Sequence, residues 1–229
     1  MATAQRRMGR NIMIFASEVP VVSALNPYRK IEDVFLDVWR RTNPRQVAKL
    51  QQELSVELLT PEEKLQTIEA AGIQQYEEKK KTVVKERNLV FSKRKVAKIT
   101  DFDVLVGGKI DGRADGKVIE VKNRVKRFIS PLPKYDIAQL QTYLFILGLT
   151  EGELVEHLHA EKMQTKMTKV PWDEKMWRKD VEPYLVRFGS ALTYLMKDKQ
   201  AQSDYLQSDG GQQREIIRYL WTQDVQRTE

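Results

Sequence analysis

The chain has 229 residues, 41% of them hydrophobic, with a formal net charge of +7 and a pI of about 9.4. That length can bury one sizeable core, and the basic balance favours a polyanionic partner without requiring one. The absence of cysteine excludes disulfides, thiolate zinc sites and a cysteine nucleophile, and is compatible with a reducing compartment. Because no apolar run approaches about 18 residues, we expect no transmembrane helix.

The N-terminal region is expected to be helical after a basic start. Ser17-Glu18 is a plausible beginning for a short helix. Asn26-Pro27-Tyr28 predicts a turn, and apolar residues at helical spacing predict a helix from Ile31 to Trp39. The polar residues 40–60 can form a further helix that ends near Thr60.

The middle of the chain combines one helix with several strands. Thr60-Pro61-Glu62-Glu63 has the residues of a helix N-terminus, with Thr as the N-cap, and predicts a helix to about Lys81. Strands are predicted at Val83–Phe91, Val96–Ile99 and Phe102–Val106. These strands lead into the segment that carries the strongest short-range signal.

That segment runs from Gly107 to Arg124 and is predicted to be a hairpin. Its Asp115-Gly116 dipeptide favours a two-residue turn, which fixes the pairing of the two strands. Strand alternation then gives the hairpin an apolar face and a charged face. The expected apolar face consists of Ile110, Ile119 and Val121. The expected charged face consists of Lys109, Asp111, Glu120 and Lys122, with Lys109 opposite Lys122.

On the charged face, Asp111 would lie directly opposite Glu120. Two opposed carboxylates repel each other and destabilise a hairpin. A divalent cation offsets this repulsion, and Mg²⁺ takes one or two carboxylates together with waters and phosphate oxygens. The structural alternative is a solvated hairpin face with diagonal Asp–Lys pairs.

The remaining elements follow in order. After a proline-rich turn, a helix is predicted in which the apolar side chains of Ile137, Leu140, Leu144 and Leu147 line one stripe, and Gln139, Gln141 and Tyr143 lie off it. Strands are predicted at Glu153–Leu158 and Met163–Val170, followed by a long helix from Asp173 through Leu195. Residues 200–211 are expected to be a polar linker. Residues 212–221 are expected to be a short helix that could dock on a neighbouring subunit.

Three segments carry a resemblance to a known family. Asp111 followed by Glu120-Val121-Lys122 resembles the D…(D/E)-x-K signature of the PD-(D/E)xK nuclease superfamily. Residues 16–39 are similar to the N-terminal segment of the YqaJ-type viral recombinases and the lambda-type exonucleases. Residues 139–143 resemble the helix that follows the catalytic hairpin in YqaJ-type and RecB-like nucleases. The joint match covers roughly residues 10–150.

The resemblance implies an α/β fold with a mixed central sheet flanked by helices, in a single domain. Its expected parts are an N-terminal helical region (1–60), a catalytic core (61–197), and a C-terminal linker with a short helix (198–229). The implied activity is metal-dependent phosphodiester hydrolysis by a DNA exonuclease, 5′→3′ from duplex ends, in recombination or repair. The implied cofactor is Mg²⁺, with Mn²⁺ as an alternative, and two ions are expected.

The resemblance also implies roles for individual residues. The carboxylates of Asp111 and Glu120, the main-chain carbonyl of Val121 and an acid on the upstream helix would bind metal. We assign that acid to Glu77, with Glu69 and Glu78 as competitors. Lys122 would orient or deprotonate the attacking water, with its pKa lowered by the adjacent cation, and Gln139 would position the water or the scissile phosphate.

The expected DNA-contacting residues are Arg10, Ser17, Lys109, Gln141 and Tyr143. Arg10 lies seven residues before Ser17, which matches the first elements of the pocket that binds a terminal 5′-phosphate in lambda-type exonucleases. Lys109 departs from that pattern, because a small hydroxyl residue stands there in the lambda-type enzyme. A lysine can still contact phosphate as a point charge.

The implied partners are double-stranded DNA ends, a single-strand annealing protein and further copies of the chain in a ring-shaped trimer. No membrane partner is expected, and the expected location is the cytoplasm, or the host-cell cytoplasm or nucleus for a viral protein. Two alternatives stay open. One is a RecB-like or structure-specific endonuclease, and the other is a catalytically inactive DNA-binding module. The intact set of Asp111, Glu120 and Lys122 argues against the inactive module.

Overall fold

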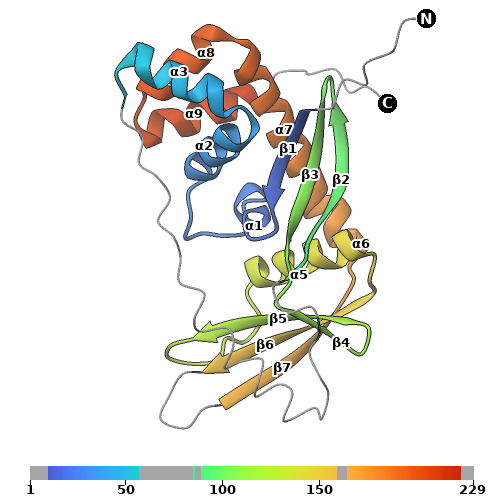
Figure 1. The fold of residues 1–229 in the computed structure, drawn as a ribbon. Coiled ribbons are helices and arrows are strands. Elements are labelled where there is room, and N and C mark those ends of the chain that lie inside the picture. The colour runs from blue at the N-terminus through green and yellow to red at the C-terminus, as the bar shows by residue number, and fades with distance from the viewer. Residues whose placement is uncertain (1–9, 57–84, 86–88, 159–163, 223–229) are drawn as a thin grey trace, which may run out of the picture.

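The computed structural model describes residues 10–56, 85, 89–158 and 164–222, and this part of the chain is a mixed α/β fold with two sheets (Figure 1). The first sheet has the order β1-β3-β2 and consists of β1 (Arg10–Phe15), β2 (Phe91–Ile99) and β3 (Phe102–Lys109). The second has the order β4-β5-β6-β7 and consists of β4 (Gly112–Ala114), β5 (Lys117–Arg124), β6 (Glu151–Leu158) and β7 (Gln164–Pro171). The single central sheet that we expected is therefore divided in two.

The helices pack around and between these sheets. They are α1 (Val19–Val22), α2 (Ile31–Thr42), α3 (Pro44–Leu54), α5 (Lys134–Leu147), α6 (Glu174–Met176), the π-helical turn η1 (Trp177–Val181), α7 (Glu182–Lys197), α8 (Lys199–Gln207) and α9 (Gly210–Leu220). Figure 1 shows α2, α3, α8 and α9 gathered at one end of the molecule and the second sheet at the other. None of the helices in the described ranges has both the length and the apolar character needed to cross a membrane.

The predicted hairpin register is confirmed for β4 and β5. Gly112 pairs with Ile119 and Ala114 with Lys117, as a two-residue turn requires. Asp115 and Gly116 both have positive φ, at 50° and 76°, which is the conformation of a type I′ turn. Aspartate and glycine tolerate this left-handed conformation better than most residues, so local chemistry sets the register.

The first strand of the predicted hairpin begins too early in the chain, because residues 107–109 belong to β3. Lys109 ends β3 in the first sheet, where it pairs with Phe91, so it does not lie opposite Lys122. Ile110 is buried in the main core, whereas Ile119 packs in a small separate cluster. The chain changes sheets at Ile110 and Asp111, which ends the alternation that the sequence pattern implied.

Other predicted elements differ in extent. The predicted strands 96–99 and 102–106 lie within β2 and β3, and the strands of residues 153–158 and 163–170 correspond to β6 and β7. The predicted strand 83–91 overlaps β2 only at Phe91. Of residues 83–90, the structure describes Lys85 and residues 89–90, and Lys85 forms an isolated β-bridge with Arg113. The helix predicted for residues 61–81 lies outside the described residues.

The prediction of a linker at residues 200–211 is wrong, because these residues belong to α8, the turn after it and the start of α9. Tyr205 anchors α8. Its ring is fully buried against Phe35 and Trp39 of α2, and its hydroxyl donates to the carbonyl of Glu32 at 2.9 Å. Polar composition concealed this helix, since a few apolar residues provide the buried contacts.

Helix α5 joins the two sheets. It packs against β2 and β3 of the first sheet and against β5 and β6 of the second. The packing is close, because a Cβ added at Gly152 of β6 would lie 2.8 Å from the Leu140 side chain. Because α5 packs against both sheets, it fixes their relative position. Asp111 and Glu120 lie where the two sheets meet.

The terminal helix predicted for residues 212–221 corresponds to α9, which docks on α2 of its own chain. Arg214 donates to the two carboxylate oxygens of buried Glu32 at 2.7 and 3.3 Å. Burial alone would raise the pKa of Glu32, but the hydrogen bonds and charge of Arg214 outweigh it and leave the pKa below its usual value of 4.5. A carboxylate with a lowered pKa stabilises the fold above its unfolded pKa.

We therefore predict that Glu32→Gln lowers the free energy of unfolding by about 1–2 kcal/mol at pH 7, the range for a hydrogen bond to a charged group with a half-exposed partner. The difference from wild type should shrink as the pH falls from about 4.5 through the lowered pKa of Glu32 in the folded protein. Urea denaturation at several pH values measures this. The matched control is Glu215→Gln, which breaks an exposed pair with Arg218 and should change little. A pH-independent difference would contradict the assignment.

Candidate active site

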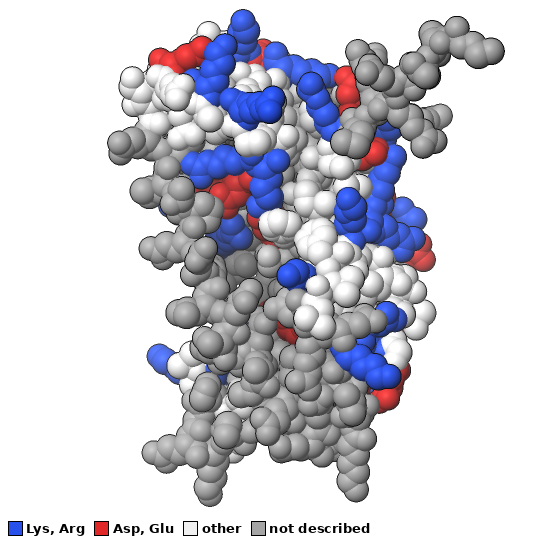
Figure 2. Space-filling model, in the orientation of Figure 1, with Lys and Arg blue, Asp and Glu red and all other residues white. Residues whose placement is uncertain are grey.

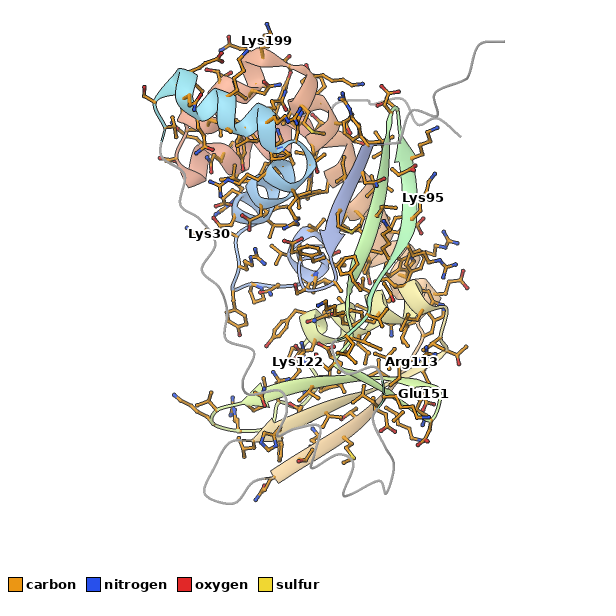
Figure 3. All side chains as sticks on the ribbon, in the orientation of Figure 1. Lys30, Lys95, Arg113, Lys122, Glu151 and Lys199 are labelled. Carbon is orange, nitrogen blue, oxygen red and sulfur yellow. The ribbon has the colours of Figure 1, made fainter. Side chains whose placement is uncertain are left out.

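Four of the predicted site residues converge where the two sheets meet. Asp111 lies between β3 and β4, Glu120 and Lys122 lie on β5, and Gln139 lies on α5. Asp111 Oδ2 accepts a hydrogen bond from the N–H of Val121 at 2.7 Å. Lys122 Nζ donates to Glu120 Oε1 at 2.7 Å and to Gln139 Oε1 at 2.8 Å. Figure 3 shows Lys122 in the space between β5 and α5.

The chain itself offsets the repulsion between the two carboxylates. Asp111 and Glu120 are only 8% and 1% exposed, so their charges interact strongly. The main-chain N–H of Val121 compensates Asp111, and the ammonium of Lys122 compensates Glu120. A metal ion is therefore not needed to hold the carboxylates in place, although the argument from the sequence invoked a divalent cation.

The charge state of Lys122 follows from its neighbours. Burial alone would lower the pKa of Lys122, but the charge and hydrogen bond of Glu120 and the charges of Asp136 and Asp111 raise it above its usual value of 10.5. The lowered pKa that we expected depended on a bound cation. With the carboxylates alone around it, Lys122 is an ammonium group.

A second layer of buried charge lies behind Lys122, and the sequence reasoning missed it. Asp136 of α5 lies 3.9 Å from Lys122 Nζ and binds Arg124 at 2.6 Å. Arg124 Nε also binds Glu156 at 2.9 Å. One signal was available, because Arg124 alternates with Lys122 along β5 and so shares its face. The parallel pairing that sets Lys122 beside Glu156 could not be read from the sequence.

Two predicted DNA contacts belong to the interior of the fold. Gln141 is buried, donates to the carbonyl of Pro171 at 2.7 Å and accepts from the N–H of Asp173 at 2.9 Å. Tyr143 is buried too, and its hydroxyl donates to the carbonyl of Lys109 at 2.8 Å. Tyr143 thereby holds the main chain two residues before Asp111, and Gln141 holds the connection between β7 and α6. A direct DNA contact by either side chain has no geometric support.

Of the other three predicted DNA contacts, Arg10 lies at one end of β1 and Ser17 and Lys109 lie near the other. Arg10 begins β1 beside Phe102, whereas Ser17 follows the opposite end of the strand. At about 3.3 Å per residue the two lie roughly 20 Å apart, so the structure does not bring them to one phosphate. Ser17 and Lys109 are both exposed near the end of the first sheet that adjoins Asp111.

The donor atoms present suit a hard divalent cation. Asp111 and Glu120 supply buried carboxylate oxygens, and Mg²⁺ takes one or two carboxylates with waters and phosphate oxygens. Within the described ranges, the structure contains no group of three or more histidine, cysteine, aspartate or glutamate side chains placed to hold a metal ion together. Glu77, the third acid that we expected, lies outside those ranges, together with its competitors Glu69 and Glu78.

Solved structures of exonucleases share this fold. An alkaline exonuclease from Laribacter hongkongensis (LHK-Exo) is 17% identical with a TM-score of 0.53, over 84% of this chain and 95% of that chain. LHK-Exo in complex with dAMP gives 17% identity and a TM-score of 0.51, over 82% and 93%. A phage-related exonuclease from Haemophilus somnus 129PT is 11% identical with a TM-score of 0.46, over 80% of this chain and 96% of that chain. That structure is too different to support an argument.

No protein-family model and no curated protein sequence matches the chain. The structural neighbours are consistent with the resemblance to the viral recombinases and exonucleases of the PD-(D/E)xK superfamily. At 17% identity, they establish a shared fold.

We predict that Tyr143→Phe destabilises the protein by about 1–2 kcal/mol, because it leaves the carbonyl of Lys109 without its hydroxyl donor. Urea denaturation measures the loss. The control is Tyr219→Phe, which removes an exposed hydroxyl from α9 and should have almost no effect. Equal stabilities of the two variants would show that the hydroxyl bond does not hold the end of β3.

Proposed function

We propose that this chain is a metal-dependent DNA exonuclease that hydrolyses phosphodiester bonds from duplex ends. The observation that carries the proposal is the convergence of Asp111, Glu120 and Lys122 with Gln139 at the junction of the sheets. The fold shared with LHK-Exo, described as an alkaline exonuclease, supports the same class of reaction.

Asp111 and Glu120 would hold the metal, with the main-chain carbonyl of Val121 and the carboxylate of Glu77 as further ligands. Mg²⁺ is the proposed ion, Mn²⁺ the alternative, and two ions the proposed number. When bound, the metal would lower the pKa of a coordinated water and neutralise negative charge on the phosphate.

Lys122 acts on the substrate as a cation. Its ammonium is fixed between Glu120 and Gln139, so it can hold a phosphate oxygen or the attacking water in one position. Orientation and deprotonation of the attacking water both stay proposed roles of Lys122, because a bound metal would offset the carboxylate charges that raise its pKa here. The carboxamide oxygen of Gln139 is occupied by Lys122, so its NH₂ group is the end that can donate to substrate.

The direction of attack and the assembly rest on the resemblance. The 5′→3′ direction loses its support from Arg10 and Ser17, because the structure separates them. A ring-shaped trimer and a single-strand annealing partner remain proposals from the same source. A RecB-like or structure-specific endonuclease stays the alternative. A catalytically inactive module is disfavoured, because the three signature side chains lie in hydrogen-bonding contact with one another or with the adjoining main chain.

Digestion of duplex DNA labelled separately at each end tests the proposal. In Mg²⁺ we expect progressive shortening from the 5′ ends, no cleavage in EDTA, and a rate reduced about a thousandfold or more in Asp111→Asn and Glu120→Gln. The control is Asp101→Asn, an exposed acid in the turn between β2 and β3. Wild-type rates for the two site variants would refute the assignment. Cleavage of circular duplex would favour the endonuclease.

A further inference from the structure

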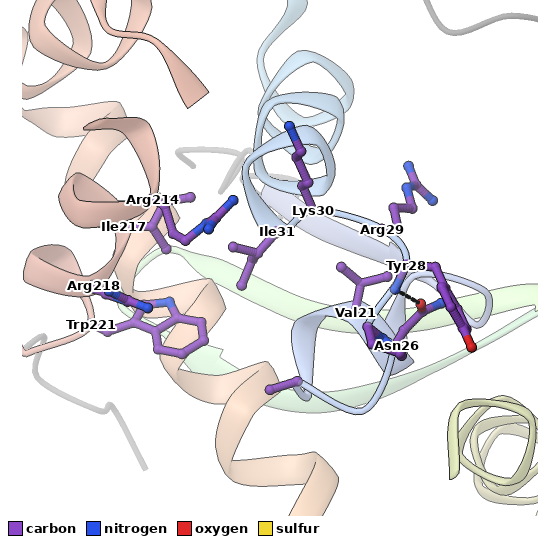
Figure 4. Close-up of a pocket in the computed structure, with 12 residues that line it drawn as sticks. Val21, Asn26, Tyr28, Arg29, Lys30, Ile31, Arg214, Ile217, Arg218 and Trp221 are labelled. Atoms are coloured by element: carbon purple, nitrogen blue, oxygen red, sulfur yellow. Dashed lines mark hydrogen bonds between the residues drawn. The ribbon is translucent and has the colours of Figure 1, made fainter. Parts of the chain in front are cut away.

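Two pockets lie end to end along one side of the molecule. The first, here called the β5 pocket, has a volume of about 490 Å³ and is lined by the segment after β5 and by Tyr135 of α5. The second, here called the α9 pocket, has about 550 Å³ and lies between the α1–α2 connection and α9. Tyr28 lines both pockets, so the two meet at this residue and are together called the path. Figure 4 shows Tyr28 at one edge of the α9 pocket.

The path carries cations that form no ion pair with an acid in the described part of the chain. Lys30, Lys126 and Arg127 are exposed and form none of the ion pairs found among the described residues. Arg214 and Arg218, which also line the α9 pocket, are paired with glutamates. On the face drawn in Figure 2, basic side chains are interspersed with acidic ones, so net charge alone does not single out a nucleic-acid surface.

Tyr28 gives the path an aromatic surface. Its side chain is 81% exposed, although the chain around it is ordered by the hydrogen bond from its own N–H to Asn26 Oδ1 at 2.9 Å. Its ring meets Tyr135 edge to face, with ring centroids 5.8 Å apart, which leaves a ring face available. Figure 4 places Trp221 at the other end of the α9 pocket.

Aromatic rings beside unpaired cations match one ligand chemistry well. Single-stranded nucleic acid stacks its bases on aromatic side chains while cations follow its phosphates. The β5 pocket adjoins the candidate active site, because Arg124, which lines it, shares the face of Lys122 on β5 and binds the same Asp136.

We propose that the β5 and α9 pockets form a track for one single-stranded stretch of the DNA substrate. Tyr28 stacks on a base at the junction of the pockets, and Lys126, Arg127 and Lys30 contact phosphates. The identity of the ligand rests on the proposed function, whereas the track itself depends only on these pockets.

Binding of a fluorescein-labelled 20-mer of thymidylate to the full chain in EDTA tests the track without cleavage. Tyr28→Ala should raise the Kd about 5- to 100-fold, the range for loss of one stacking contact. Tyr28→Phe should bind like wild type, because it keeps the ring. The matched control is Tyr219→Ala, which removes an exposed tyrosine of α9 that lines neither pocket.

Salt dependence tests the cations independently. The double variant Lys126→Ala/Arg127→Ala should reduce the slope of log Kd against log salt by about 1.4, since each phosphate contact on a single strand contributes about 0.7. The control Lys175→Ala/Lys179→Ala removes the same charge from exposed positions on α6 and η1 and should leave the slope closer to that of wild type.

The outcomes separate the track from the nuclease proposal. Equal Kd values for wild type and Tyr28→Ala, with hydrolysis intact, would overturn the track alone. Loss of binding in the track variants of a protein that never hydrolyses DNA would support the track and overturn the nuclease. Equal displacement of the oligonucleotide by poly-glutamate would overturn the assignment to nucleic acid.

Discussion

The arrangement depends on how β5 holds Asp111. At Ile110 and Asp111 the chain leaves the first sheet and enters the second, and the N–H of Val121 fixes the Asp111 carboxylate at that crossing. Helix α5 packs on both sheets and presents Gln139 to the same point. A slip of one residue in the hairpin would turn Glu120 and Lys122 to the opposite face, so the turn at Asp115-Gly116 determines whether a site exists.

Alternating charge makes this buried site possible. Glu120, Lys122, Asp136, Arg124 and Glu156 follow one another with opposite signs between β5, α5 and β6. Each carboxylate has a cation near it, and removal of any one would leave an uncompensated buried charge, which is usually costly. The network holds Lys122 as an ammonium beside the two acids. In this arrangement the Lys122 ammonium is held in one position between Glu120 and Gln139.

Local chemistry in the sequence predicted the turn and most of the described helices, and it singled out Asp111, Glu120, Lys122 and Gln139, which the structure brings together. Sequence did not predict the division into two sheets, because Ile110 continues an alternating pattern and only long-range packing ends it. Helix α8 was concealed by polar residues around Tyr205. The distance in space between Arg10 and Ser17 could not be predicted from their spacing in the sequence, because it depends on β1 being an extended strand. The ion pair between Arg124 and Glu156 could not be predicted, because it depends on the parallel pairing of β5 and β6.

Calorimetric titration with Mn²⁺ tests the central claim most directly, because it measures the metal site without a substrate. The account predicts saturable binding to the wild-type protein, loss of that binding in Asp111→Asn and Glu120→Gln, and affinity equal to or above wild type in Lys122→Met, where a competing cation is gone. Binding unchanged by Asp111→Asn and Glu120→Gln, or the absence of saturable binding to the wild type, would contradict it.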